Sequence, residues 1–187
     1  ELLKAIGKLL EPIHRQVASA APTALAQQQL AVMTKVGDSE SILARVALEP
    51  RLRESEHEES MLKLQTTLAQ ARSLAIAVGN LQRELVAHRD DLPAELRESV
   101  ESVQEQVMAA LDAYAAGLRG DACQSPVTIP LDALEQSFAN ATTAVPKICK
   151  SAILSATENV VLQLTKLPSW SEMAAKPTNM ELSASHA

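Results

Sequence analysis

Apolar residues recur every three to four positions along most of this chain, which is the spacing of one face of an α-helix. The clearest run follows Pro93, and a second precedes the charged residues 89–91. The apolar positions of the run after Pro93 are Leu96, Val100, Val103, Val107, Ala110 or Leu111, Tyr114 and Leu118. Those of the preceding run are Met61, Leu64, Leu68, Ala71, Leu74, Val78, Leu81 and Leu85. The pattern therefore predicts two long amphipathic helices, and each apolar face needs a packing partner.

A charged break at residues 89–93 separates these two helices and ends in Leu92-Pro93. Proline suits the first turn of a helix, where its missing N–H would be unpaired anyway. Asp90 and Asp91 precede that turn and favour the positive end of the helix dipole. We therefore predict a turn here, and a long antiparallel helical hairpin at the centre of the fold.

Two further helical segments are predicted before the hairpin. Residues 1–20 carry apolar residues at helical spacing, with Pro12 as the one irregularity. The next segment begins near Pro22 and has a weak break at Gly37, because glycine can end a helix. It ends near Pro50, because the residue before a proline is pushed out of the helical conformation. Its predicted apolar face consists of Leu25, Leu30, Met33, Val36, Ile42, Leu43, Val46 and Leu48.

After the hairpin, residues 117–130 are predicted to form the longest loop, since they contain two glycines and two prolines in a polar setting. A last long helix follows over residues 131–167. Pro146 lies inside it and removes one internal hydrogen bond, so we expect either a kink or two shorter helices. From residue 168 the periodicity ends. The fold class predicted is all-α: an antiparallel bundle of about five helices in a single domain, residues 1–167, with a flexible tail, residues 168–187.

Composition excludes some classes of function. Only 2% of the residues are aromatic, which leaves few rings on which bases could stack, and the net charge is −6 with no basic run. Proteins that bind nucleic acids need clustered Lys and Arg for the phosphates. We therefore expect no nucleic-acid partner.

The chain contains no apolar run of the roughly 18 residues that a membrane-spanning helix requires. Residues 1–10 lack an uninterrupted apolar core, so they are not interpreted as a signal peptide. The chain starts without Met and already in helical rhythm. This start is typical of a segment cut from a longer protein.

The two cysteines, Cys123 and Cys149, match no metal or redox spacing. Cys149 lies on a predicted apolar face, where cysteine behaves as a small hydrophobic residue. Cys123 lies in the predicted loop, and a disulfide between the two requires that loop to fold back. A pair of free thiols in a reducing compartment is the simpler interpretation.

The sequence contains no set of residues typical of catalysis. Its four histidines, His14, His57, His88 and His186, have no His or Cys partner at helical spacing. The acidic residues around His57 could gather a divalent cation, but neighbouring residues on a helix point in different directions, which favours a solvated surface. Glycines are scattered, and no serine lies in a nucleophile elbow. We expect no catalytic residue, no metal and no cofactor, and therefore not an enzyme.

One arrangement resembles a known family. A helix ends in Ala47-Leu48-Glu49-Pro50, a polar gap follows, and Leu92-Pro93 opens the second helix of the hairpin. This order resembles the soluble helical region of the fusaric acid resistance and aromatic acid exporter superfamily, which includes the aluminium-activated malate transporters of plants. The family's element has two residues between Ala and Glu, whereas this chain has one. The family-like motif residues are Glu49, Pro50, Leu92 and Pro93.

This resemblance implies a soluble domain at the cytoplasmic face of a membrane. Its partner would be the transmembrane part of the same anion or organic-acid transporter-like protein. The domain would serve dimerisation, giving a homodimer, or gating, and it would have no catalytic role.

The alternative is a stand-alone helical-bundle module for protein–protein interaction, which would offer a partner an apolar groove. The feature that would favour it is an apolar stripe left exposed after the core is filled. Our candidate for that stripe lies after Pro146, where the apolar face shifts. Its residues are Ile153, Val160, Leu164 and Leu167.

Overall fold

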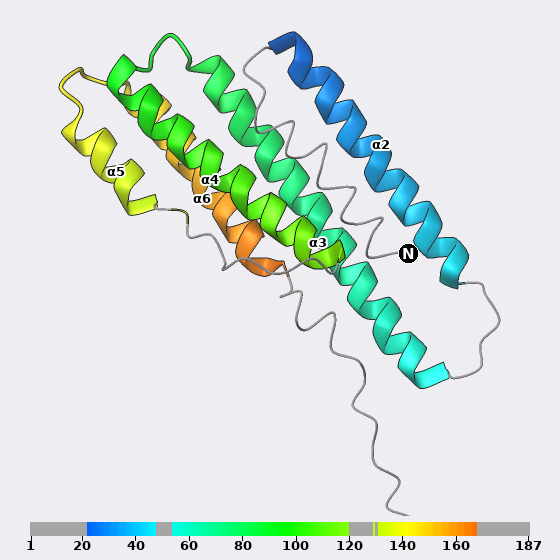
Figure 1. Cartoon of the computed structure of the whole chain (residues 1–187). Helices are drawn as coiled ribbons and strands as arrows, with labels where there is room; N and C mark the ends of the chain where they lie inside the picture. The colour runs from blue at the N-terminus through cyan, green and yellow to red at the C-terminus, as the bar shows by residue number, and fades with distance from the viewer. Residues whose placement is uncertain (1–21, 48–53, 120–128, 130, 168–187) are drawn as a thin grey trace, which may run out of the picture.

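The fold is seen in a computed structural model that describes residues 22–47, 54–119, 129 and 131–167 (Figure 1). Within these ranges the chain forms helices and no strand. The helices are α2 (Pro22–Ala47), α3 (Glu54–Ala87), α4 (Ala94–Arg119), α5 (Leu131–Asn140) and α6 (Lys147–Lys166). The predicted all-α fold class is therefore confirmed.

The helices run up and down along one long axis (Figure 1). α2 and α3 are antiparallel, and so are α3 and α4. A turn at residues 88–93 connects α3 and α4, at the place of the turn predicted over residues 89–93. α6 starts at the end of the bundle where α3 finishes and runs back along it. α2 and α5 lie at opposite edges of the bundle.

Helix α3 is the centre of the fold, although its closest partner is not the one that the hairpin suggests. α3 packs most extensively on α6 and next on α2, whereas α4 packs mainly on α5. The hairpin connection is therefore as predicted, but the α3 face is covered by a helix that lies much later in the sequence.

This position explains why α3 buries more than one stripe. The predicted residues are buried or half-buried, and five more join them: Thr67, Ala75, Ala77, Gly79 and Gln82. Thr67 satisfies its hydroxyl by donating to the carbonyl oxygen of Lys63 at 2.8 Å. Small side chains on α3 allow close approach of neighbouring helices, and burial on several sides weakens the single-face pattern in the sequence.

Helix α4 follows its predicted pattern. Leu96, Val100, Val103 and Val107 are buried, and the stripe continues through Leu111 rather than Ala110. All five helices contribute side chains to one buried cluster. Each large aliphatic side chain buried in this way stabilises the fold by about 1.5–3 kcal/mol relative to its exposed state.

The predicted apolar face of α2 is partly wrong. Leu30 and Met33 are exposed, whereas Val32, which the prediction left out, is buried. The buried positions are spaced seven, four, three and four residues apart, as one helical face requires. These positions are Leu25, Val32, Val36, Ser39 and Leu43. The sequence pattern does not show this register, because Ser39 is polar although it occupies a buried position. Its burial is tolerated because its hydroxyl donates a hydrogen bond to the Lys35 carbonyl oxygen at 2.9 Å.

Two predicted breaks have different outcomes. Pro146 does divide the last helical segment, because α5 ends at Asn140 and α6 starts directly after the proline. Gly37 does not interrupt α2, which continues to Ala47. A single glycine costs a helix only about 1 kcal/mol, and the packing of α2 on α3 outweighs that cost.

Several predictions fall outside the described residues. They are the helix over residues 1–20, the Glu49-Pro50 motif, the position of Cys123, the tail at 168–187 and most of the loop predicted over residues 117–130, whose first three residues belong to α4. The domain limits, residues 1–167, also extend past the described ranges. The end of α2 at Ala47 agrees with the boundary predicted near Pro50.

Candidate functional site

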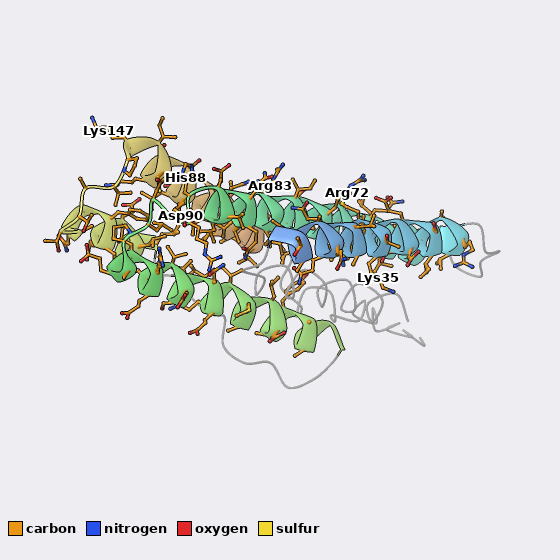
Figure 2. All side chains as sticks on the ribbon, turned by 90° about the horizontal axis from the view of Figure 1, so that it is seen from above. Lys35, Arg72, Arg83, His88, Asp90 and Lys147 are labelled. Carbon is orange, nitrogen blue, oxygen red and sulfur yellow. The ribbon has the colours of Figure 1, made fainter. Side chains whose placement is uncertain are left out.

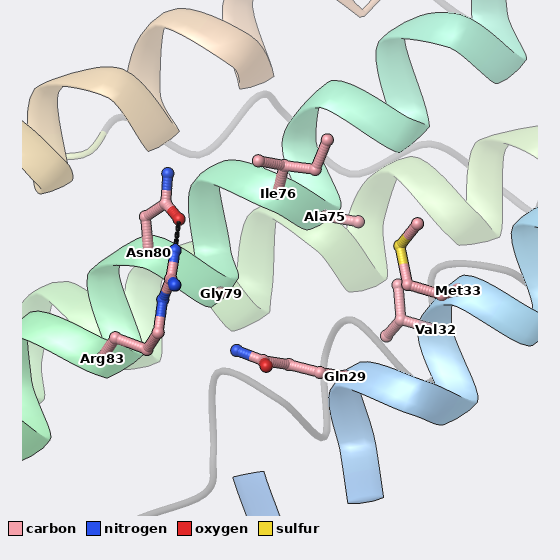
Figure 3. A pocket seen from close by; sticks show the side chains of 8 residues that line it. All are labelled: Gln29, Val32, Met33, Ala75, Ile76, Gly79, Asn80 and Arg83. Carbon is pink, nitrogen blue, oxygen red and sulfur yellow. Dashed lines mark hydrogen bonds between the residues drawn. The ribbon is translucent and has the colours of Figure 1, made fainter. Parts of the chain in front are cut away.

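The groove between α2 and α3 is the candidate functional site. It contains a hollow of about 190 Å³ that opens to solvent and lies between one face of each helix (Figure 3). From α2 it is lined by Gln29, Val32 and Met33, and from α3 by Ala75, Ile76, Gly79, Asn80 and Arg83. We call this surface the α2–α3 groove.

The residues that line the groove recur at the spacing of one helix side on both α2 and α3. Residues 29, 32 and 33 share one side of α2, and residues 75, 76, 79, 80 and 83 share one side of α3. At the floor, Val32 is fully buried and Ala75 and Gly79 have little or no side chain. Large residues on the walls and small ones on the floor therefore leave a hollow where the two helices meet.

Large apolar side chains stand exposed around this hollow. Met33 is 44% exposed and Ile76 is 50% exposed, and both line it. Leu30, one helical turn from Met33, is 70% exposed. Single exposed apolar residues are common on proteins, but two that line one hollow, Met33 and Ile76, mark a surface that can lose water to a partner.

Two arginines project from the same side of α3, about three helical turns apart (Figure 2). Arg72 donates to the carboxylate of Glu40 on α2 at 2.9 Å, so its charge is paired. Arg83 lies at the end of the hollow and donates to the amide oxygen of Asn80 (Figure 3). No carboxylate among the described residues pairs with Arg83. The groove therefore combines an apolar hollow with an uncompensated positive charge.

The family-like residues Leu92 and Pro93 lie in the turn between α3 and α4. Leu92 is buried, and its carbonyl oxygen accepts a hydrogen bond from Arg97 Nε at 3.1 Å. The Pro93 carbonyl oxygen accepts from the N–H groups of Leu96 and Arg97, so Pro93 directly precedes the helix rather than forming its first turn. These contacts show that both residues shape the turn; the other two motif residues, Glu49 and Pro50, lie outside the described ranges.

His88 lies at this turn between two acidic side chains. Its Nδ1 lies 3.1 Å from a carboxylate oxygen of Asp91, and its Nε2 lies 3.7 Å from a carboxylate oxygen of Glu84. Both ring nitrogens therefore face acids, one at the end of α3 and one in the turn. This arrangement holds the turn in place and leaves neither nitrogen directed at an open cavity.

Cys149 is buried and free at the start of α6. Burial raises the pKa of its thiol, and the nearby charge of Asp91 raises that pKa further. A raised pKa disfavours the thiolate, which is the nucleophilic form. The environment therefore fits the predicted role of a small hydrophobic core residue.

The predicted interaction stripe on α6 is not an exposed surface, so that prediction is wrong. Ile153 and Val160 are fully buried, Leu167 is buried and Leu164 is half-buried. The reason is that α6 turns this face toward α3. The sequence indicates that the stripe needs cover, but not that α3 of the same chain covers it.

A second hollow, of about 270 Å³, lies between α4 and α5 and is lined partly by serines. Ser99 donates to Ser137 at 3.0 Å, and Ser137 donates to the carbonyl oxygen of Ala133 at 2.8 Å. These hydroxyl groups therefore form hydrogen bonds within and between α4 and α5, where the two helices pack together.

The described part of the chain contains neither a metal-binding cluster nor a helix that could span a membrane. No group of three or more His, Cys, Asp or Glu residues there is arranged to hold a metal ion. None of the helices described is long and apolar enough to cross a membrane. The fold and the groove thus define the class only as an all-α helical bundle with an apolar surface groove. Comparison with protein-family models, curated proteins and solved structures gave no match.

Proposed function

We propose that this chain is a non-catalytic helical domain that binds another protein through the α2–α3 groove. The observation that carries the proposal is the pair of exposed apolar side chains, Met33 and Ile76, that line an open hollow. Apolar anchors and pockets at the centre, with polar residues at the rim, are typical of protein-binding surfaces. Here Gln29, Asn80 and Arg83 form the polar part.

The shape of the hollow supports a protein ligand over a small molecule. Sites for small molecules are usually concave, have volumes of about 300–1,000 Å³ and enclose most of the ligand. This hollow is smaller and lies open along a groove between two helices. A helix laid along such a groove can place single apolar side chains into it.

Site-specific photo-crosslinking in the cells that produce the chain tests this function. A photoreactive residue replaces Met33 or Ile76 in the groove, or Leu162 on α6 as the control, which is also 50% exposed. We expect a defined crosslinked partner from both groove positions and not from Leu162. The product from Met33 should disappear when Ile76→Glu places a charge in the groove. Equal products from all three positions, or none from the groove, would contradict the proposal.

A second candidate function is the one implied by the transporter resemblance. The observation in its favour is the α3–α4 hairpin, whose turn carries Leu92-Pro93 directly before α4. In this case the partner would be the transmembrane part of the same protein, with the domain acting in dimerisation or gating. Sequencing the gene upstream of the codon for Glu1 tests it, because this candidate requires encoded membrane spans there.

A further inference from the structure

We infer that the α2–α3 groove selects an amphipathic helix that carries an acidic residue beside its apolar stripe. Arg83 is the residue that binds the carboxylate. This inference rests on the proposed function, because it specifies the partner of the same groove. The evidence for this inference is the difference in charge pairing between two arginines of α3, Arg72 and Arg83.

The two arginines on this side of α3 differ in how their charges are used. Arg72 is neutralised within the fold by Glu40, through a 2.9 Å contact that joins α3 to α2. Among the described residues, the polar partner of Arg83 is an uncharged amide, that of Asn80. Its neighbour Glu84 directs its carboxylate to His88 instead, at 3.7 Å. Arg83 is therefore the cation at the hollow that has a bidentate donor group available for an external carboxylate.

The apolar part of the groove identifies what the carboxylate is attached to. The hollow, about 190 Å³, is lined largely by Val32, Met33, Ala75 and Ile76. An apolar cavity of about 150 Å³ can hold a benzene-sized group, so one aliphatic side chain fits here. A free inorganic anion would leave these apolar walls wet. The matching ligand has an apolar side chain for the hollow and an acid within about one helical turn of it, which an amphipathic helix supplies.

The test uses the full chain and dye-labelled helical peptides of about 18 residues, long enough to present a continuous stripe. Each peptide has leucines at helical spacing and one Glu, which is moved through the positions that flank the stripe. Matched peptides carry Lys or Gln at the same position. Binding is measured by fluorescence anisotropy at about 0.05 M and about 0.5 M salt.

We expect one register in which the Glu peptide binds about tenfold more tightly than the Lys peptide, and less so at high salt. Arg83→Glu should reverse this preference, and Arg83→Gln should remove it. Arg89→Glu is the matched control, because it makes the same charge change at the exposed α3–α4 turn. It should leave the preference intact. Circular dichroism of each variant checks that the helices persist.

Different failures separate the acid preference from the groove itself. If Glu and Lys peptides bind equally and Ile76→Glu abolishes both, the groove binds helices but Arg83 does not select them, and the inference is overturned. If no peptide binds and the chain forms a dimer that Ile76→Glu dissociates, the occupant is a second copy, which also overturns it. Weak binding of inorganic phosphate that competes with the Glu peptide would show an anion site and contradict selection of a helix.

Discussion

The carboxylate of Glu95 joins the start of α4 to Thr142 in the α5–α6 loop. It accepts hydrogen bonds from the Thr142 backbone N–H at 2.9 Å and from the Thr142 hydroxyl at 3.2 Å. It also accepts one from the backbone N–H of Thr143 at 3.4 Å. One side chain in the first turn of α4 therefore fixes the connection that positions α6 against α3.

Replacing Glu95 should loosen this connection. We expect Glu95→Ala to lower the free energy of unfolding by about 1–3 kcal/mol, because charge-assisted hydrogen bonds to backbone N–H groups are lost. Urea unfolding followed by circular dichroism measures the change. Glu98→Ala, which removes an exposed acid one turn later, is the control and should change stability by less than about 0.5 kcal/mol. Equal effects of the two substitutions would contradict this role of Glu95.

The two isoleucines at the start of α6 should respond very differently to truncation. Ile153 is fully buried, whereas Ile148 is 77% exposed. We expect Ile153→Ala to destabilise the protein by about 2–5 kcal/mol through the cavity that it leaves. Ile148→Ala should cost less than about 0.5 kcal/mol. Denaturation midpoints of both variants test the position of α6, and a small effect at Ile153 would mean that α6 does not pack on the core.

Gly37→Ala should stabilise the protein. The glycine lies inside α2, and a methyl group added there meets no atom within 4 Å. Alanine has less conformational freedom to lose, so we expect a gain of about 0.5–1 kcal/mol in the free energy of unfolding. Ala44→Gly, at an exposed position of the same helix, should lower stability by a similar amount. Thermal unfolding of both variants measures this pair, and destabilisation by Gly37→Ala would show that residue 37 is not helical.

Stability should fall at alkaline pH because of Tyr114. Burial raises the pKa of its phenol above the ordinary value of about 10. Below that value the phenol is neutral in both states, so its contribution to stability is complete. As the pH rises further, the unfolded chain loses this proton first and is favoured, by up to about 1.4 kcal/mol per pH unit. Tyr114→Phe should remove this part of the pH dependence in urea unfolding.

A direct measurement of ionisation is available for the same residue. Tyr114 is the only tyrosine of the sequence, so the ultraviolet absorbance of tyrosinate reports its ionisation alone. The folded protein should ionise at higher pH than the protein in urea. Identical titration curves in the two conditions would contradict the burial.

Cys149 should resist thiol reagents in the folded protein. It is buried, and its raised pKa reduces the thiolate fraction further. In a Cys123→Ser background, which leaves one thiol, Ellman's reagent should react slowly until denaturant is added. Rapid reaction without denaturant would mean that the start of α6 opens readily.

Helical periodicity made the helices and the core of α4 predictable. One face of α4, with Leu96, Val100 and Val103, is buried, and the opposite face is exposed to solvent. Rotation and pairing were harder to predict. In α2 the polar Ser39 occupies a core position, so periodicity assigned Leu30 and Met33 to the core. Met33 and Ile76 instead line the groove. The one available signal was that Ile76 falls out of phase with the buried Leu74 and Val78.

The interaction stripe on α6 was misplaced for a related reason. Spacing shows which side chains of a helix share a face, but it does not show which helix covers that face. Ile153 and Val160 pack in the core because α6 returns to α3. Their pattern is the same as that of a stripe that awaits an external partner.

The pairing of α3 with α6 has a consequence for synthesis on the ribosome. Helix α3 is complete at Ala87, but the helix that covers much of it is complete only at Lys166. A growing chain therefore carries an uncovered hydrophobic seam until α6 leaves the exit tunnel, and such seams attract chaperones or neighbouring nascent chains. Ribosome-bound chains that stop before Lys147 should be captured by ribosome-associated chaperones much more than chains whose added C-terminal linker brings Lys166 out of the exit tunnel.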